Sequence, residues 1–167
     1  GDGRIDFAMG AKGKPFENGN YFAVYYSPKD INKPWKKELL PGSGEQFGAT
    51  HASPADVNGD GKIDILATRG HGVGVLWFEA PDWKQHVIDD TIDSTHSTDF
   101  GDIDGDGIAD LVTGAHGHST SGDTSGRTYL IMSGRLGEPG ELYFPDAADY
   151  IWDGEDDGDE SGKRNVY

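Results

Sequence analysis

The sequence predicts an all-β fold assembled from repeated units of four short antiparallel strands. A nine-residue acidic pattern occurs twice in full and once in part, at spacings that suit a structural repeat. Runs of five or six aromatic and β-branched residues follow each copy, and such runs favour strands over helices. Glycine makes up 26 of the 167 residues, which favours turns and short strands.

The acidic pattern is D-x-[DN]-x-D-G-x-x-D, at residues 56–64 and 102–110. Side-chain oxygens at positions 1, 3 and 5, a backbone carbonyl at position 7 and an acid at position 9 can surround one hard cation. Ca²⁺ takes about six to eight oxygen ligands in flexible geometry, so it is the expected ion. Acidic, glycine-rich segments also form solvated turns, but a second copy with identical spacing favours the cation loop.

Residues 1–6 match the second half of the same pattern, with Asp2 at position 5 and Asp6 at position 9. Because the first three positions would precede residue 1, we expect the sequence to be a piece of a longer polypeptide. The ninth-position acids Asp6, Asp64 and Asp110 are separated by 58 and 46 residues (64 − 6 and 110 − 64).

Each acidic pattern is followed by strands in the same order. The first strand is a short apolar run that ends in a glycine turn, and the second is rich in aromatic residues. The third begins at a tryptophan in two copies, and the fourth leads into the next acidic pattern. The predicted strands lie within residues 7–13, 21–26, 35–40, 47–56, 65–72, 73–78, 83–88, 94–102, 111–117 and 127–132.

Four short strands every 46 to 58 residues are typical of β-propeller blades. The cation loop would join the innermost strand of a blade to the next strand outward. The whole chain, residues 1–167, would then be a partial propeller. We expect blade remnants at about residues 1–46, 47–92 and 93–145, and the start of a further blade at residues 146–167.

The third unit departs from the pattern. Residues 116–126 are rich in Ser, Thr, Gly and Asp, which predicts a long surface loop. No tryptophan-led third strand follows, and residues 142–145 and 150–152 stand in its place. Residues 153–161 form an acidic segment that lacks the ninth-position acid, which favours a solvated loop over a degenerate fourth cation loop.

Composition narrows the possible partners. The chain has 30 acidic residues against 14 Lys and Arg, a formal net charge of −16, which disfavours nucleic acid and anionic membranes. No apolar run approaches the roughly 18 residues of a membrane span. Cysteine is absent, so neither disulfides nor thiolate metal sites hold the fold. Calcium loops and the lack of cysteine suit an extracellular or cell-surface location of bacterial type.

Two stretches carry a resemblance to known repeats. Phe100-Gly101 and Gly114-Ala115-His116 resemble the Phe-Gly and Gly-Ala-Pro framing of FG-GAP repeats, with His in place of Pro. Residues 75–89 resemble the aromatic-Pro-Trp strand pairs of VCBS repeats. Both families are calcium-binding β-propellers, and the resemblance covers about residues 1–135. It implies a propeller of seven or eight blades, of which this chain would supply about three and a half.

The resemblance also implies structural calcium ions in the acidic loops. The expected ligands, matched by motif position, are Asp56, Asn58, Asp60, Asp64 and the Lys62 carbonyl for one ion, Asp102, Asp104, Asp106, Asp110 and the Ile108 carbonyl for a second, and Asp2, Asp6 and the Arg4 carbonyl for half of a third site. An EF-hand is excluded, because position 12 is Ala67 in one loop and Thr113 in the other instead of the bidentate Glu.

Histidines are the remaining candidates for chemistry. His51 and His96 both follow a threonine on predicted innermost strands, whose side chains can reach the central funnel of a propeller. The arrangement resembles that of sugar lyases and an aldosulose dehydratase, in which histidines near the axis act as acid–base groups or metal ligands. Ordinary hydrogen-bonded surface histidines are the alternative.

The other four histidines offer weaker expectations. Three of them, His71, His116 and His118, lie in the turns after the second strand of their blades, counted from the innermost strand, and could gather a transition metal. Loop histidines often have no such role. His86 lies on an outer strand, and we assign no function to it.

Three functional hypotheses follow. The first is an extracellular, calcium-stabilised repeat module that binds carbohydrate or protein. The second is the propeller domain of a sugar- or polysaccharide-acting lyase or dehydratase, with His51 and His96 as catalytic residues. The third is a structural or assembly protein whose blades are completed by another chain, or by the rest of the propeller, through an open sheet edge. Fold alone does not decide among them.

Overall fold

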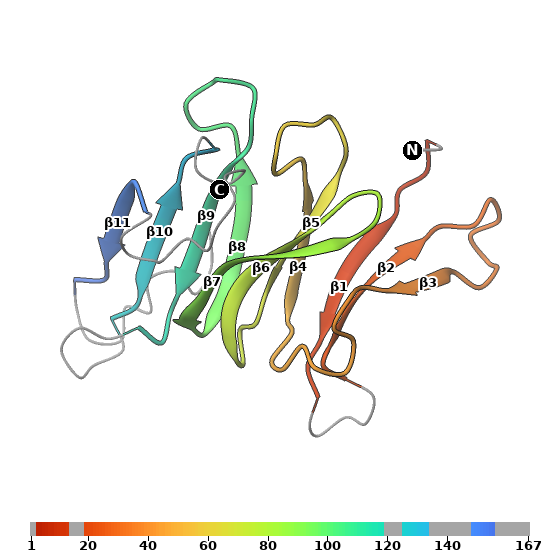
Figure 1. Ribbon diagram of the computed structural model, residues 1–167, viewed down its shortest axis with the longest axis horizontal. Coiled ribbons are helices and arrows are strands. Elements are labelled where there is room, and N and C mark those ends of the chain that lie inside the picture. Colours follow the sequence, from red (N-terminus) through yellow and green to blue (C-terminus); the bar gives the residue numbers. More distant parts are fainter. Residues whose placement is uncertain (1–2, 14–18, 119–124, 134–147, 156–167) are drawn as a thin grey trace.

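The computed structural model of the chain describes residues 3–13, 19–118, 125–133 and 148–155 (Figure 1). Within them, every described strand pairs antiparallel with its neighbours. The strands are β1 (Phe7–Ala11), β2 (Tyr21–Tyr26), β3 (Lys36–Leu39), β4 (His51–Ala55), β5 (Asp64–Thr68), β6 (Val73–Glu79), β7 (Lys84–Asp93), β8 (Thr95–Gly101), β9 (Asp110–Ala115), β10 (Arg127–Ile131) and β11 (Tyr150–Asp153).

The strands form three sheets, each following chain order. The first has the order β1-β2-β3, the second β4-β5-β6-β7 and the third β8-β9-β10-β11. We call them the first, second and third blades. Antiparallel strands that follow one another in chain order across a four-stranded sheet are the arrangement of a propeller blade. The predicted all-β fold of four-stranded, blade-like sheets is therefore confirmed.

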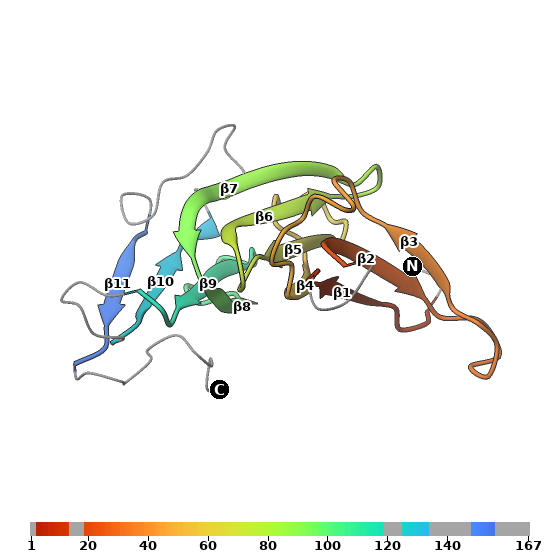
Figure 2. The ribbon, with the colours of Figure 1, turned by 90° about the horizontal axis from the view of Figure 1, so that it is seen from below.

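The inner strands of the three blades lie next to one another. Strand β4 is in contact with both β1 and β8, and Figure 2 shows these three strands near the middle, with β3, β7 and β11 toward the outside. The acidic loops join β4 to β5 and β8 to β9 at the upper ends of the sheets in Figure 1. Because the strands alternate in direction, the turns β5–β6, β7–β8 and β9–β10 lie at the opposite ends.

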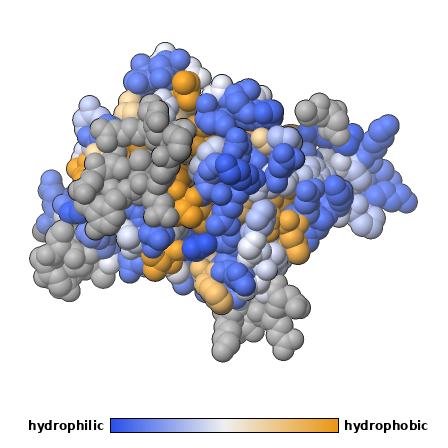
Figure 3. Space-filling view, in the orientation of Figure 1, coloured by the Kyte–Doolittle hydropathy of each residue, from blue (hydrophilic) through white to orange (hydrophobic). Residues whose placement is uncertain are grey.

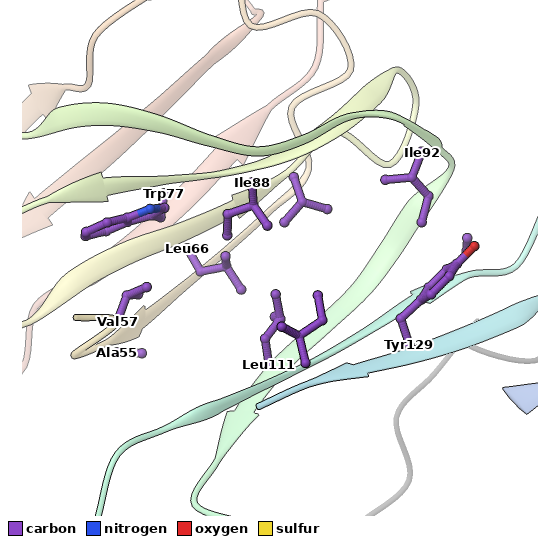
Figure 4. Packing of buried hydrophobic residues seen from close by; sticks show 11 residues of the cluster. Ala55, Val57, Leu66, Trp77, Ile88, Ile92, Leu111 and Tyr129 are labelled. Atoms are coloured by element: carbon purple, nitrogen blue, oxygen red, sulfur yellow. The ribbon is translucent and has the colours of Figure 1, made fainter. Parts of the chain in front are cut away.

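The core lies between the blades rather than within one sheet. Successive side chains of a strand face opposite sides, so Leu66 packs with the third blade while Ile65 and Ala67 pack with the first. Figure 4 shows Leu66 and Trp77 of the second blade facing Leu111 of the third. Fully burying each large apolar side chain stabilises the fold by about 1.5–3 kcal/mol. Packing between blades thus fixes the relative positions of the loops.

The last strand corrects one expected boundary. We expected residues 146–167 to begin a further blade, but β11 pairs with β10 in the register Thr128 to Trp152. It is the outermost strand of the third blade, in the place that the tryptophan-led strands hold in the others. The predicted strand at 142–145 and most of the acidic segment at 153–161 lie outside the described residues.

The surface agrees with the composition. The face visible in Figure 3 is largely hydrophilic, with hydrophobic side chains in separate patches between the blue areas. In the described part of the chain, no helix is long and apolar enough to cross a membrane.

Candidate functional site

The acidic loop at residues 102–110 gathers three exposed carboxylates. Asp102 accepts a hydrogen bond from the backbone N–H of Gly107 at 3.0 Å, and Asp104 and Asp106 each accept one from the second residue after them, at 3.1 and 2.8 Å. One oxygen from each of Asp102, Asp104 and Asp106 lies within 4.8 Å of the others. Like charges at this separation repel one another, so the local backbone holds an arrangement that a cation would stabilise.

The loop at residues 56–64 repeats this geometry. Asp56 accepts from the Gly61 N–H at 2.8 Å, and Asn58 accepts from the Asp60 N–H at 3.1 Å. One difference separates the two loops. The Lys62 ammonium forms an ion pair with Asp60, which lowers the pKa of Asp60 through their hydrogen bond and places a positive charge against a predicted ligand.

The ninth-position acid has a structural role that the sequence did not reveal. Asp64 is fully buried, and its carboxylate accepts hydrogen bonds from the N–H of Val57 at 3.1 Å and from the N–H of Ala80 at 2.8 Å. Burial raises the pKa of Asp64, while these two backbone bonds oppose that rise. The side chain thus ties its own loop to the residue that follows β6.

The same contact occurs in all three blades. Asp110, also fully buried, accepts from the N–H of Ile103 at 2.7 Å and from the N–H of Ser133 at 2.8 Å. Asp6 accepts from the N–H of Ser27, just after β2, at 2.8 Å. A carboxylate oxygen has two lone pairs, so these bonds leave room for a cation. We call this contact, from the ninth-position carboxylate to the backbone just after the next blade strands, the latch. It links each loop to its blade without a bound ion.

The structure shows fewer contacts for the remaining predicted calcium ligands. Lys62 and Ile108 donate their backbone N–H groups to the position-5 carboxylates, which sets position 7 beside position 5 in both loops. In the partial first loop, the Arg4 side chain donates to the carbonyl of Ser27 at 2.9 Å. Asp2 lies outside the described residues.

His51 and His96 lie in different surroundings. His51 is exposed on β4, and its Nε2 is 2.8 Å from the Ser53 hydroxyl. His96 is half-buried on β8, between two other imidazole rings. Both histidines were predicted on innermost strands, and the structure places them there.

A β-bulge explains why the two differ. In β8, Thr95 pairs with Ala115 and Ser97 pairs with Gly114, so His96 is an extra residue with no paired position on β9. Strand β4 has no such shift. An inserted residue re-aims the side chain and bends the strand. His51 therefore corresponds in register to Ser97, not to His96.

Three histidines form a cluster at the junction of the second and third blades. The rings of His71 and His96 have centroids 4.6 Å apart, as do the rings of His96 and His116, and both pairs pack edge to face. Burial lowers the pKa of His96, and the neighbouring positive charges of His116, His71 and Lys12 lower it further. Sequence reasoning had grouped His71 and His116, but it missed His96 as the ring between them.

His118 and His86 stand apart from this cluster. The pKa of His118 is lowered by burial and by the charge of Arg127. The ring of His86 stacks on Trp77 at 4.4 Å, and its Nε2 is 2.7 Å from the Glu79 carboxylate. His118 was predicted in a group with His71 and His116, and the structure places it beside β10 instead.

Comparison with protein families gives one match. Residues 56–113, which span both complete acidic loops and most of the second blade, match the FG-GAP-like repeat. Over this segment the match confirms the resemblance to FG-GAP repeats. Comparisons with curated proteins and with solved structures gave no match.

Proposed function

We propose that the chain is a calcium-stabilised β-propeller repeat module that acts outside the cell and binds a carbohydrate or protein ligand. The observation that carries the calcium part is the convergence of Asp102, Asp104 and Asp106, whose carboxylate oxygens lie within 4.8 Å of one another on an exposed loop. Within the described residues, none of these three carboxylates forms an ion pair with a basic side chain.

The donor set fits calcium. All the predicted groups are carboxylate, amide or carbonyl oxygens, which hard cations of this kind prefer, and no imidazole belongs to either loop. Calcium supplies positive charge and several bonds to one loop. The chain itself supplies the loop shape, because backbone N–H groups already orient the oxygens of Asp102 and Asp56.

The two loops are expected to differ in affinity. Residues 102–110 carry four carboxylates, at Asp102, Asp104, Asp106 and Asp110, for a formal charge of −4. Residues 56–64 carry three carboxylates and the Lys62 ammonium, for −3 + 1 = −2. Ligand charge tunes calcium affinity in such loops, so the loop at 102–110 should bind calcium more tightly.

The ligand is expected on the face opposite the acidic loops. There the inner strands β4 and β8 begin, and His51 is exposed. Ligands often bind at such openings in propellers. The strongly acidic chain makes nucleic acid an unfavourable partner. An extracellular location supplies the millimolar calcium that loops of this kind need in extracellular modules.

Equilibrium dialysis with calcium tests the proposed loops. We expect two calcium ions per chain, in two classes of affinity, and the tighter class should disappear in Asp104→Ala. Wild-type protein that binds no calcium at millimolar concentration would contradict the calcium part.

Titration of polysaccharides into the calcium-loaded protein tests the ligand part. Binding that is weakened in His51→Ala and preserved in His86→Ala supports the proposed face. The enzymatic hypothesis is tested in the same samples by the absorbance of unsaturated sugar products.

A further inference from the structure

The three-histidine cluster lies at the point where three turns meet. His71 belongs to the turn between β5 and β6, His96 to the start of β8, and His116 to the turn that follows β9. The cluster is at the opposite ends of the strands from the acidic loops, so none of the predicted calcium ligands contributes to it. It joins the second blade to the third.

Backbone contacts fix where these rings lie. The N–H of Ser94 donates to the carbonyl of Gly72 at 3.3 Å, and the Thr95 hydroxyl donates to the carbonyl of Gly74 at 3.4 Å. These bonds attach the start of β8 to the turn that carries His71 and to the beginning of β6. The bulge in β8 then directs His96 toward that turn.

Close backbone approach completes the arrangement around Gly70. A Cβ at Gly70 would lie 2.8 Å from the Thr50 hydroxyl and 3.0 Å from the His96 ring, so only glycine leaves room for the imidazole. The Gly70 backbone therefore lies against the His96 ring.

One ring nitrogen in the cluster lacks a partner. The Nδ1 of His116 is buried and finds no hydrogen-bond partner among the described residues. Buried polar atoms are nearly always paired, and an unpaired one points to an absent water or ion. Packing of three aromatic rings alone does not explain a buried, unpaired nitrogen.

The ring spacing suits a shared metal ion. A metal about 2.0–2.1 Å from a ring nitrogen lies about 3.2 Å from the ring centroid, so two rings on one tetrahedral ion have centroids about 5 Å apart. The observed separations are both 4.6 Å. The rings now pack edge to face, and their nitrogens do not all lie within 4.8 Å of one another. Binding would therefore rotate His71 and His116 about their broad terminal torsions to bring the nitrogens together.

We propose that His71, His96 and His116 form a binding site for one transition-metal ion of the zinc type, at the junction of the second and third blades. Imidazole nitrogen is a ligand for zinc, copper and nickel and a poor one for calcium. Three protein ligands leave a fourth position of a tetrahedral ion open to water or to an oxygen of a ligand. The site would also clamp two blades together through His71 on one and His96 and His116 on the other.

The test is a calorimetric titration of zinc into the protein in excess calcium, which keeps the acidic loops filled. We expect one zinc ion per chain. Both His71→Gln and His96→Gln should weaken binding by more than the roughly ten- to hundredfold that loss of an outer partner costs. The matched control is His51→Gln, which removes an exposed histidine of the neighbouring inner strand and should bind zinc as the wild type does.

Cobalt(II) absorption and circular dichroism provide two further measurements. Cobalt(II) in the site should give the intense visible bands of a tetrahedral nitrogen-ligated ion, and these bands should vanish in His71→Gln. His71 is exposed, so this variant keeps its fold even where His96→Gln does not, and circular dichroism without metal verifies it. The proposal is overturned by the absence of stoichiometric zinc binding, by equal binding in His71→Gln and wild type, or by zinc binding that excess calcium abolishes.

Discussion

Substitution of the ninth-position acid distinguishes stabilisation by the hydrogen bonds of that acid from stabilisation by bound calcium. Asp110 is fully buried and accepts hydrogen bonds from Ile103 and Ser133 at 2.7 and 2.8 Å. Hydrogen bonds to a charged group contribute about 1.5–3 kcal/mol each. Removing the buried charge recovers part of this sum, because the carboxylate no longer has to be desolvated. We therefore expect Asp110→Ala to lower the free energy of unfolding by about 2–4 kcal/mol even in EDTA.

Urea denaturation in EDTA and in calcium measures this difference, with Asp104→Ala as the control. Asp104 is exposed and its oxygen accepts only a local N–H. In EDTA its removal should change the free energy of unfolding by about 0.5 kcal/mol or less, the range of ordinary surface substitutions. In calcium it should abolish most of the stabilisation by that ion. A loss below about 1 kcal/mol for Asp110→Ala in EDTA, or equal losses for the two variants, would refute the structural role of the latch.

Three further predictions concern the loops and the histidine cluster. Asn58→Asp adds a carboxylate to the weaker loop and should raise its calcium affinity, measured by dialysis, while an unchanged affinity would contradict the charge argument. The pKa of His96 is lowered from 6.5 in the folded state, so the unfolded chain binds more protons at that residue. The free energy of unfolding in EDTA should therefore fall as the pH drops below about 6.5. In urea denaturation, His96→Gln should reduce this dependence on pH. Gly48 has φ +78°, and a Cβ there would lie 2.3 Å from the backbone of the β5–β6 turn, so Gly48→Ala should lower the free energy of unfolding by at least about 2 kcal/mol. Gly61→Ala is the control, because a Cβ there meets nothing within 4 Å. It should lower the free energy of unfolding by about 1–2 kcal/mol, for its left-handed backbone alone.

Local sequence patterns were sufficient to predict the blades. Each blade strand is a short alternating or apolar run, and the period of two places Leu66 and Ile65 on opposite faces, as the inter-blade core requires. The acidic pattern also located the loops that join the inner strand to the next one. Strand β11 was harder to assign, because a strand without a tryptophan at its start gives no sign of which sheet it joins.

The histidine cluster and the latch depend on contacts between distant residues. His96 lies six residues before Asp102, whereas His51 lies five before Asp56, and that single extra residue was the available sign of a bulge. The partners of the ninth-position acids that follow the next strands, such as Ser133, lie 16 to 23 residues further along the chain. No spacing within the nonapeptide encodes such a partner.

Thermal denaturation followed by circular dichroism, with calcium and with EDTA, tests the central claim most directly. A cation that binds the folded loops and not the unfolded chain stabilises by about 2.7 kcal/mol at a concentration of 100 times its dissociation constant. The account predicts a clearly higher midpoint in calcium, reversed by EDTA and reduced in Asp104→Ala. Superimposable curves in calcium and in EDTA would contradict it.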